Sequence, residues 1–417
     1  MVLPPANDRP PTCQVNGRQT TLGKPWTPTL VRAAAGGYTV VMSDDTPILD
    51  PTAPAPPAAD DAPRPDPLRS VYTSTFGEVL RAAGISLAVS TYQAGKVILV
   101  RWDESTGTVN THFRAFGKPM GIAADAARLA IGGQNTVWHY RNMPAVARKM
   151  EPAGTHDAAY LPRRVHVTGD IDIHEMAWAG DGQLWLVNTR FGCLCTLDAD
   201  HSFHPRWRPP HLSALAPEDR CHLNGLAMLD GRPQFVTLLG ETDTPGGWRA
   251  NKAAGGLLME VPTNRVLLRG LSMPHSPRWY DRRLWLLESG QGSLALANVR
   301  GGAWQAVATL PGFTRGLSFY GPLAFIGLSQ VRESATFSGI PLVERLEERI
   351  CGVWVVDIRD GRTVGFLRFE EGVQEIFAVE VLPWRFADML DWGDERLRTS
   401  YVLPDEALAA VPEGMRE

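Results

Sequence analysis

Short apolar runs separated by turns recur along most of the chain, and most pairs of runs begin with a polar residue. Six such segments are "MGIAADAARLAIGG" (120–133), "HEMAWAGDGQLWLVNT" (174–189), "NGLAMLDGRPQFVT" (224–237), "HSPRWYDRRLWLLES" (275–289), "RGLSFYGPLAFIGL" (315–328) and "QEIFAVEVLPW" (374–384). Their first residues, here called the anchors, are Met120, His174, Asn224, His275, Arg315 and Gln374, at intervals of 40 to 59 residues. A strand-turn-strand unit at this period is typical of β-propeller blades.

Two further strand-like stretches follow most of these units, such as "GCLCTLD" and "SFHPRW" in the second, which gives four strands per blade. The sixth unit stops after its first strand, whereas "ISLAVSTYQ", "KVILVRW" and "TVNTHFRAF" (85–116) precede the first anchor without an inner strand. Pairing the C-terminal inner strand with these N-terminal outer strands would close the ring and remove exposed sheet edges. The pattern therefore predicts an all-β, six-bladed β-propeller over residues 69–390. A pair of stacked β-sandwiches is the alternative, but sandwiches rarely repeat one motif six times in register.

The two ends of the chain differ from this repeating region. Residues 1–68 are rich in Pro and Ala, as in "PTAPAPPAADDAPRPDPL" (51–68), and cannot bury enough apolar surface to offset the entropy lost on ordering. We expect a disordered tail there. Met42 would be a natural start, so residues 1–41 are expected to lie upstream of the true beginning. Residues 391–417 are predicted to form a C-terminal tail.

Composition limits the classes of partner. The 417 residues carry a formal net charge of −4, which argues against a nucleic-acid partner, since such surfaces are strongly basic. No apolar run is long enough to span a membrane, and the N-terminus lacks a secretory pattern, so we expect no membrane association and a cytoplasmic location. The five cysteines lack CxxC spacing, which indicates reduced, packed thiols: Cys13, Cys193, Cys195, Cys221 and Cys351.

The anchors point to the chemistry. The first strand of each propeller blade lines the central channel, so its first residues ring the channel mouth. His222 and Asn224 lie two residues apart and should face the same side of a strand, and His174 and His275 hold matching positions in the neighbouring blades. Imidazole is the commonest protein ligand for transition metals. His174, His222 and His275 are therefore predicted to bind a divalent metal ion (Fe, Zn or Cu), with open positions for substrate.

Other polar residues are predicted to face these histidines. Arg315, Gln374 and Glu375 project from the opposite half of the ring. Glu175 and Glu375 are candidates for a fourth ligand, a partner that orients an imidazole, or a general base. We expect Glu375 and Arg315 to be catalytic, with Arg315, Arg190 and Arg249 neutralising an anionic substrate or a developing oxyanion.

Two loops, 240–256 and 329–349, are far longer than ordinary hairpin turns and should cap the same face. Trp248 lies in the first of them and is a candidate platform for a sugar or an aromatic ligand. The predicted substrate-binding residues are Asn224, Glu175, Arg190, Glu241, Asp243, Trp248, Arg249, Arg332 and Gln374.

Ten stretches carry a resemblance to a known family: "STYQAGK", "HEMAW", "NTRFGCLCTLD", "RWRPP", "DRCHLNGLAM", "GETDTPGGWR", "GLSMPHSPRW", "LPGFTRGLSF", "CGVWVVD" and "GVQEIFAVEVLP". Together they resemble the uncharacterised conserved-hypothetical family TIGR03032, related to the domain-of-unknown-function group DUF4915. The resemblance spans nearly all of residues 84–384. It implies that the channel-mouth histidines and the capping loops are family hallmarks, and it implies no mechanism.

The inner-strand spacing also resembles that of gluconolactonase-like six-bladed enzymes, whose metal is held by carboxylate and amide ligands. His174 and His275 stand where such ligands would be expected, so lactonase activity does not carry over.

The sequence leaves three functions open. The first is a metal-dependent enzyme, a hydrolase or an oxygenase, that acts on a small or peptide-like, anionic substrate at the three-histidine site. The second is a non-catalytic propeller that binds a small ligand or a protein partner, with the histidines making hydrogen bonds or simply lining the channel. The third is a metal-free hydrolase that uses an arginine and a carboxylate.

Overall fold

In this computed structural model the chain divides into two units, residues 1–63 and 64–417. The structure describes the backbone of four strands in the first unit, and residues 68–331 and 338–416 in the second. The four strands form two hairpins, β1 (Thr12–Val15) with β2 (Arg18–Thr21) and β3 (Thr29–Arg32) with β4 (Tyr38–Val41). The rest of residues 1–67 lies outside the described residues, so the disordered tail and the later start at Met42 stay predictions.

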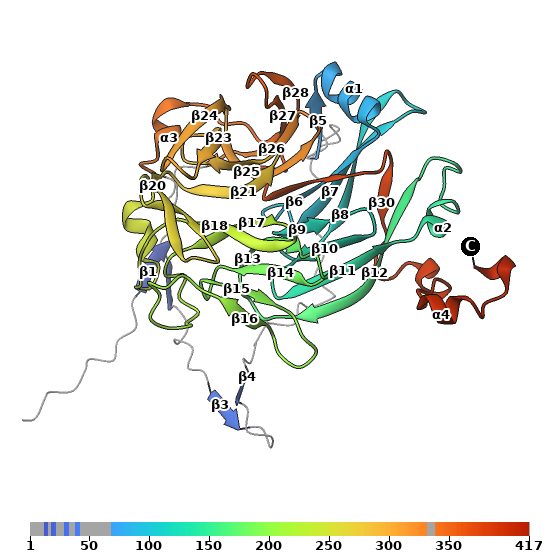
Figure 1. Ribbon diagram of the computed structural model, residues 1–417, viewed down its shortest axis with the longest axis horizontal. Helices are drawn as coiled ribbons and strands as arrows, with labels where there is room; N and C mark the ends of the chain where they lie inside the picture. The colour runs from blue at the N-terminus through green and yellow to red at the C-terminus, as the bar shows by residue number, and fades with distance from the viewer. Residues whose placement is uncertain are drawn as a thin grey trace, which may run out of the picture. The chain divides into compact units, whose positions relative to one another are not determined.

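The second unit is a six-bladed β-propeller, as the repeating pattern predicts (Figure 1). The first two blades consist of β9 (Ile122–Ala124), β10 (Arg128–Gly132), β11 (Thr136–Asn142) and β12 (Ala158–Val167), followed by β13 (Ile173–Trp178), β14 (Leu184–Asn188), β15 (Cys193–Thr196) and β16 (His204–Trp207). The next two consist of β17 (Leu223–Leu229), β18 (Arg232–Leu238), β19 (Gly256–Glu260) and β20 (Arg265–Leu271), followed by β21 (Pro274–Tyr280), β22 (Arg283–Glu288), β23 (Ser293–Asn298) and β24 (Ala303–Thr309).

The fifth and sixth blades combine segments from both ends of the unit. They consist of β25 (Phe313–Tyr320), β26 (Leu323–Ser329), β27 (Gly352–Asp357), β28 (Thr363–Phe369) and β5 (Ser70–Tyr72), and of β29 (Ala378–Leu382), β6 (Ser86–Thr91), β7 (Lys96–Asp103) and β8 (Thr108–Ala115). The inner strand β29 pairs antiparallel with β6, from Ala378 opposite Ser90 to Leu382 opposite Ser86. The predicted closure of the ring is therefore confirmed.

Two additional outer strands extend the sheets beyond the predicted four. β5 pairs antiparallel with β28, and β30 (Ala387–Met389) pairs parallel with β12. Each has only three residues, too few to show a period-two pattern in the sequence. Both cover outer strands whose backbone groups would otherwise be free to pair with another chain.

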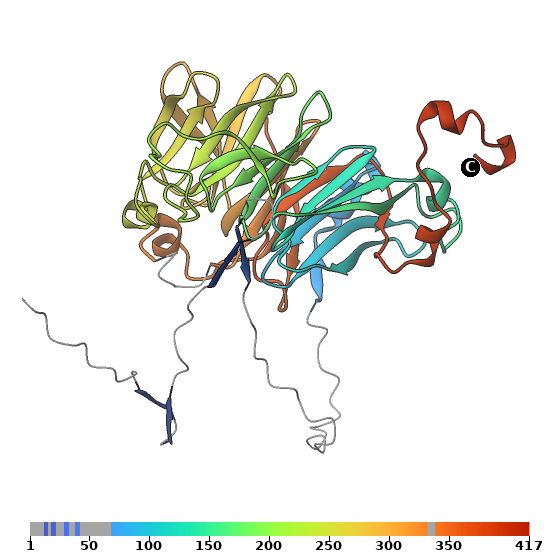
Figure 2. The same cartoon turned by 90° about the horizontal axis from the view of Figure 1, so that it is seen from below.

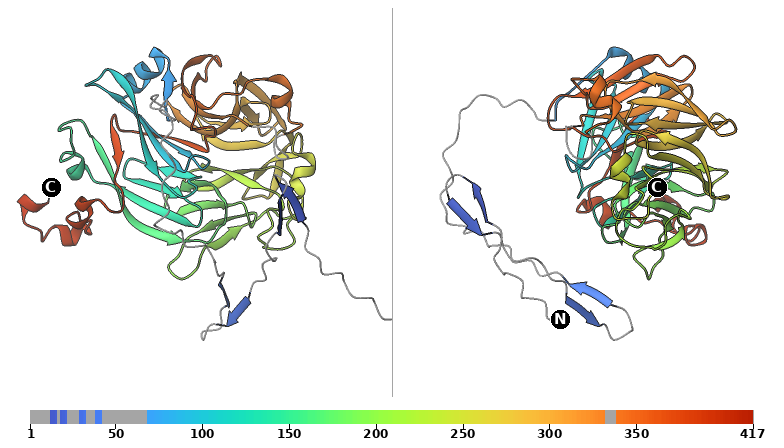
Figure 3. Two further views of the ribbon diagram at one scale, coloured as in Figure 1. Left: turned by 180° about the vertical axis from the view of Figure 1, so that it is seen from behind. Right: turned by 90° about the vertical axis from the view of Figure 1, so that its left-hand side faces the viewer.

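The helices are short and lie outside the ring. They are α1 (Ser74–Ala83), α2 (Pro144–Ala147), η1 (Gly247–Asn251), α3 (Pro341–Arg345), η2 (Glu395–Arg398), α4 (Asp405–Leu408) and η3 (Glu413–Met415). α1 begins where the Thr73 hydroxyl accepts a hydrogen bond from Phe76 N and ends at Gly84, whose φ of 64° suits glycine. Figures 2 and 3 show the C-terminal segment leaving the ring beside α2. No helix in the described ranges is long and apolar enough to cross a membrane.

The core lies between adjacent blades, where the faces of neighbouring sheets pack together. Trp285 and Leu287 of the fourth blade, for example, pack in one cluster with Ile326 and Trp354 of the fifth. The four cysteines within the described ranges are free and buried, as expected for packed thiols. This layered packing fixes the inner strands around the channel.

The inner strands place equivalent residues at equal depth. One residue before the anchor, Ile173 pairs with Asn188, Leu223 with Leu238, Pro274 with Glu288 and Thr314 with Leu328, and the register shifts close to the anchor in each case. In the sixth blade the residue at the anchor position is Phe377. The next residue, Ala378, begins β29, and its backbone lies against that of Gly316, which follows the anchor Arg315. The structure therefore places Phe377, and not Gln374, at the sixth anchor position. Gln374 precedes the strand, where its backbone N–H donates to Gln93 Oε1.

Candidate functional site

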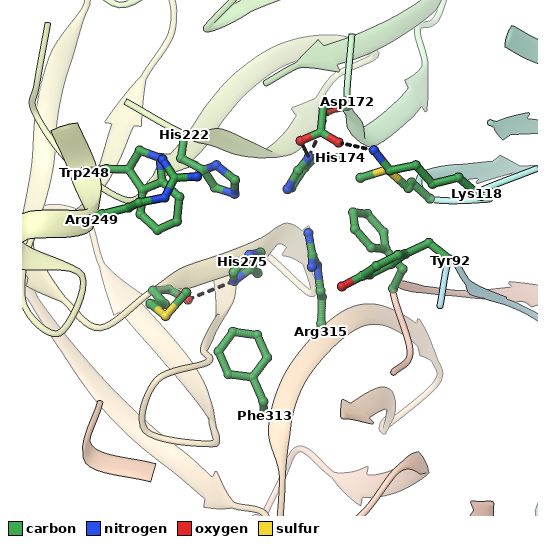
Figure 4. Close-up of a pocket in the computed structure, with 13 residues that line it drawn as sticks. Tyr92, Lys118, Asp172, His174, His222, Trp248, Arg249, His275, Phe313 and Arg315 are labelled. Carbon is green, nitrogen blue, oxygen red and sulfur yellow. Dashed lines mark hydrogen bonds and ion pairs between the residues drawn. The ribbon is translucent and has the colours of Figure 1, made fainter. Parts of the chain in front are cut away.

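A cavity of about 280 Å³ occupies the channel mouth at the level of the anchors (Figure 4). Its walls are Tyr92, Lys118, Met120, Asp172, His174, His222, Trp248, Arg249, Met273, His275, Phe313, Arg315 and Phe377. Five of the six anchor positions contribute to it, and the ring geometry brings together residues separated by up to 285 positions along the chain (Tyr92 to Phe377).

The three predicted metal ligands all line this cavity. The imidazole rings of His174 and His222 lie edge to face with their centroids 4.7 Å apart. His174 and His275 are only 7% and 3% exposed. Figure 4 shows the three rings and the guanidinium of Arg315 pointing toward a shared space.

The backbone orients two of these rings in the same way. Nδ1 of His174 lies 3.0 Å from the carbonyl oxygen of Asp172, and Nδ1 of His275 lies 2.9 Å from that of Met273. Asp172 and Met273 both have left-handed φ values, 56° and 47°, and stand two residues before the histidine. A carbonyl oxygen only accepts, so Nδ1 carries the proton in both rings and Nε2 is left for the cavity.

His222 reaches the cavity by a different route. It occupies the position equivalent to Asp172 and Met273, directly before its strand, with φ of 51°. Its Nδ1 is held by the carboxylate of Asp219, at 2.9 and 3.0 Å from the two oxygens.

The true anchor of this blade, Asn224, is buried and does not line the cavity. Its amide donates to Pro274 O at 3.0 Å and accepts from the Thr237 hydroxyl at 2.8 Å. Asn224 therefore joins two blades, and the expectation that it faces the channel together with His222 differs from what the structure shows.

The loop 240–256 covers the site, as predicted from its length. Trp248 from η1 packs on His222 with ring centroids 4.4 Å apart, and its Nε1–H donates to Asp219 at 2.9 Å. The guanidinium of Arg249 lies 4.3 Å from the centroid of the Trp248 ring. Because Trp248 is only 2% exposed, it serves as a wall that fixes His222 and not as an open platform for a sugar.

Arg315 is the most unusual group in the cavity. Its guanidinium lies 3.5 Å from the centroid of the Phe377 ring, and within residues 68–331 and 338–416 it makes no ion pair with a carboxylate. Burial lowers the pKa of Arg315, an effect that Tyr92, Glu375 and Asp172 oppose. An arginine nonetheless stays charged in proteins, so the cavity holds a positive charge without a close counter-ion.

The acidic residues near the cavity are already engaged. Asp172 accepts from Lys118 Nζ at 3.0 Å. Burial alone would raise the pKa of Asp172, but the charge of Lys118 and its hydrogen bond hold that pKa well below its usual range. Glu375 is not part of the cavity wall. Its carboxylate accepts a hydrogen bond from the Tyr92 hydroxyl, and burial together with this carboxylate raises the pKa of Tyr92.

Burial disfavours a positive charge on the imidazoles of His174 and His275. Burial lowers the pKa of His174 and of His275 well below the usual value, and for both rings the nearby charge of Arg315 acts in the same direction. With Nδ1 protonated and the ring uncharged, Nε2 of each is a hydrogen-bond acceptor.

Glu175 belongs to a deeper layer of the channel. Its two carboxylate oxygens each accept a bond from Arg278, both at 3.0 Å, and Arg278 also lies 3.3 Å from Glu380. Arg278 lies three residues after the anchor His275, and Glu380 lies three residues after the anchor Phe377. With the sixth anchor at Phe377, this equal spacing in the sequence would have predicted that the two side chains lie at the same depth. Glu175 therefore closes the channel floor and does not face the cavity.

Three further predicted substrate-binding residues lie outside the cavity wall. Arg190 pairs with Asp170 at 2.9 Å, Asp243 with Arg220 at 2.7 Å, and Glu241 with Arg269. Arg332 lies outside the described residues, as does Glu333 of the same loop. Seven residues of the site were not predicted from the sequence: Tyr92, Lys118, Asp172, Met273, Phe313 and Phe377 of the cavity wall, and Asp219 behind His222.

The three imidazoles do not form a preassembled metal centre. Over 68–331 and 338–416, no group of three or more His, Cys, Asp or Glu side chains is placed so that it could hold a metal ion. The charge of Arg315 points into the same space and would oppose a cation there.

Fold and site together define a β-propeller with a ligand-sized, positively charged cavity at one mouth of its channel. The family model described as "Domain of unknown function (DUF4915)" matches residues 74–390, and the chain belongs to this family. No curated protein matches the chain.

Two of the solved structures that match the chain are as follows. One is described as "Crystal structure of Nidogen/Laminin Complex", with a TM-score of 0.47 and 10% identity, over 72% of this chain and 100% of that chain. The other is a protein of unknown function from Bacteroides caccae, with a TM-score of 0.45 and 11% identity, over 72% of this chain and 99% of that one.

Proposed function

We propose that the cavity at the channel mouth binds a small ligand that carries a carboxylate or another anionic group. The observation that carries this proposal is the guanidinium of Arg315, which points into the cavity without a carboxylate at ion-pair distance in the described ranges. A buried charge without a partner is costly, and a bound anion would supply that partner. Lys118 and Arg249 line the same cavity but lie beside the carboxylates of Asp172 and Asp219, so the unbalanced positive charge is that of Arg315.

The same arrangement supports acid–base chemistry on the ligand. His222 presents Nε2 to the cavity while its Nδ1 is bound to the carboxylate of Asp219, the pairing that orients imidazole bases. Arg315 would stabilise negative charge that develops on the ligand. A hydrolase without a metal ion, with His222 as the base, is the enzyme that these groups favour.

The metal-dependent enzyme predicted from the sequence is a second candidate. It is favoured by one observation: all three imidazoles have Nδ1 held from behind, which is the arrangement that metal-binding histidines adopt. His174, His222 and His275 would hold Fe, Zn or Cu through Nε2, and the metal would supply a Lewis acid or an activated water. The placement of these side chains and of Arg315 does not match a closed centre, so no reaction step is derived through a metal.

Calorimetric titration tests the anion-binding proposal. Small carboxylates such as phenylacetate are titrated into protein that has been treated with a chelating resin. We expect Arg315→Gln to weaken binding at least tenfold, because the charge-assisted pair is lost. Arg190→Gln is the matched control, since Arg190 lies outside the cavity and is paired with Asp170. Unchanged binding by Arg315→Gln, or no binding of any carboxylate by the unaltered protein, would contradict the proposal.

Elemental analysis tests the metal candidate independently. Protein purified without a histidine tag is assayed for Fe, Zn and Cu, next to His174→Ala and His275→Ala. Stoichiometric metal that both variants lose, and that the exposed-site variant His201→Ala retains, would support the metal centre. A metal-free protein whose melting temperature is indifferent to added Zn²⁺ would exclude it.

The cellular setting is also a proposal. We infer a cytoplasmic location, which the free, buried cysteines of the described ranges support, because oxidising compartments favour disulfides. A small-molecule or peptide-like ligand is the proposed partner, and a protein partner stays a prediction.

A further inference from the structure

The hydrogen-bond acceptors in the cavity wall require a ligand to have more than a negative charge. This inference rests on the proposed function. His174 and His275 both donate Nδ1–H to main-chain carbonyl oxygens, at 3.0 and 2.9 Å. Both rings are buried beside the guanidinium of Arg315, which disfavours a second proton on either ring. A neutral imidazole has one N–H, so both rings accept a hydrogen bond through Nε2. Within the described ranges, no side chain or backbone group donates to either Nε2.

These two acceptors flank Arg315, which can only donate. Figure 4 shows the Arg315 guanidinium directed between His174 and His275. A ligand that satisfies all three groups must therefore combine an anionic acceptor for Arg315 with hydrogen-bond donors for the imidazoles. A simple carboxylate or a sulfate has no donor and would leave both Nε2 atoms without a partner, at a cost.

Part of the cavity wall is apolar. Met120, Met273, Phe313 and Phe377 contribute side chains with few polar atoms, and the ring of Tyr92 lies edge to face against Phe377 with centroids 5.7 Å apart. The volume of about 280 Å³ lies at the small end of the range of roughly 300–1,000 Å³ typical of small-molecule sites. The cavity is thus suited to a small acid with an apolar part.

We infer that the ligand is a small carboxylic acid that carries a hydroxyl or an ammonium group beside its carboxylate, together with an apolar substituent. The carboxylate pairs with Arg315, and the neighbouring O–H or N–H donates to Nε2 of His174 or His275. α-Hydroxy acids and α-amino acids with an aromatic or branched aliphatic side chain belong to this class.

Matched ligands that differ by a single group test this inference. Mandelate, phenylglycine and phenylacetate share the ring and the carboxylate, and only the first two carry a donor; lactate and propanoate form a smaller pair. Each is titrated calorimetrically at pH 7.5 into protein treated with a chelating resin, because hydroxy acids bind metals. We expect mandelate or phenylglycine to bind at least fivefold more tightly than phenylacetate, as one additional hydrogen bond typically changes affinity about two- to tenfold.

A variant locates the effect. His174→Phe keeps a ring against Phe377 but removes the acceptor, and His201→Phe, in an exposed turn, is the control. We expect His174→Phe to reduce the preference for mandelate over phenylacetate at least threefold while the affinity for phenylacetate changes less than twofold. If this variant does not fold, the titration of matched ligands into the unaltered protein still tests the inference.

The outcomes separate the two proposals. Equal affinity for mandelate, phenylglycine and phenylacetate, all weakened by Arg315→Gln, would overturn the donor requirement and leave the anion site standing. Tighter binding of phenylacetate would overturn it as well. Absence of binding for every acid tested would overturn both, since the inference depends on the anion site.

Discussion

The imidazole of His222 and the indole of Trp248 lie with their ring centroids 4.4 Å apart and share the carboxylate of Asp219. His222 Nδ1 is 2.9 Å from one carboxylate oxygen, and Trp248 Nε1 donates to the other at 2.9 Å. One acidic side chain thereby fixes both the loop that covers the cavity and the ring that faces it. The loop and the imidazole should consequently respond together when either hydrogen bond is removed.

Trp248→Phe removes the N–H donor and keeps an aromatic ring in the buried position. We expect the free energy of unfolding to fall by about 1–2 kcal/mol, since a hydrogen bond to a charged acceptor is lost. Urea unfolding followed by circular dichroism measures this change. Trp304→Phe is the control, because Trp304 is 38% exposed on β24 and should change stability by less than about 0.5 kcal/mol. An equal loss in both variants would show that the bond to Asp219 contributes nothing specific.

Closure of the ring is a second test of the architecture. Val379 is fully buried in β29 and lies opposite Val89 of β6, where the two ends of the propeller meet. Val379→Ala should lower the free energy of unfolding by about 2–3 kcal/mol through the lost methyl groups and the cavity they leave. The comparison is Val167→Ala at the end of β12, where the side chain is 66% exposed and the change should be small. A loss below about 1 kcal/mol for Val379→Ala would mean that this seam is not a packed interface.

The sequence predicts both the ring and its closure, because each follows from the number of strands in the repeating units. The sixth unit lacks outer strands and the N-terminal segment lacks an inner one, and no other arrangement pairs them all. The common location of His174 and His275 follows in the same way, since equivalent positions of neighbouring blades lie at one depth.

Local backbone conformation could not be derived from the pattern. His222 faces the cavity and Asn224 does not, because the register shifts between Leu223 and Gly225 and the left-handed conformation at His222 redirects its side chain. Alternation along an ideal strand would send both to one side. The dependence of His222 on Asp219 was equally hidden, since Asp219 lies in a connection whose conformation no repeat specifies.

The sixth anchor was misplaced by three residues for a related reason. Ile376 is apolar and reads as the first strand residue, but it packs into the core cluster beneath Gly327, and β29 starts only at Ala378. With Phe377 at the anchor, the ion-pair partner Glu380 falls on the same layer as Arg278. Spacing alone does not distinguish the apolar residue before a strand from the strand itself.

The tautomers of His174 and His275 can be observed directly. Free histidine prefers the Nε2–H form, but the carbonyl oxygens of Asp172 and Met273 require Nδ1–H in both rings. Nitrogen-15 correlation spectra of histidine-labelled protein at pH 7 should show two neutral rings of the Nδ1–H form, assigned by His174→Gln and His275→Gln. His166, whose Nε2 lies 3.0 Å from the carbonyl oxygen of Ser202, provides the Nε2–H reference. Detection of Nε2–H rings at either site would remove the basis for two acceptors in the cavity.

The layer beneath the cavity should make stability depend on pH. Burial raises the pKa of Glu380 from 4.5 to about 7, although the charge of Arg278 opposes the shift. Burial prevails because both oxygens of Glu175 already bind Arg278, which leaves Glu380 with a single contact at 3.3 Å. A carboxyl whose pKa is raised on folding stabilises the fold in full below pH 4.5, and this contribution is lost as the pH rises through 7.

Glu380→Gln removes that titration while it preserves the Glu175–Arg278 pair. We expect the variant to gain about 1–3 kcal/mol of unfolding free energy relative to the unaltered protein between pH 4.5 and pH 8. Urea unfolding across this range measures the difference, and Glu78→Gln on the exposed face of α1 controls for surface charge. Glu288, whose pKa is also raised to about 7 by burial, is present in both proteins and cancels in the comparison. A difference that stays constant with pH would show that Arg278 keeps Glu380 ionised, and the channel floor would then carry two carboxylates on one guanidinium.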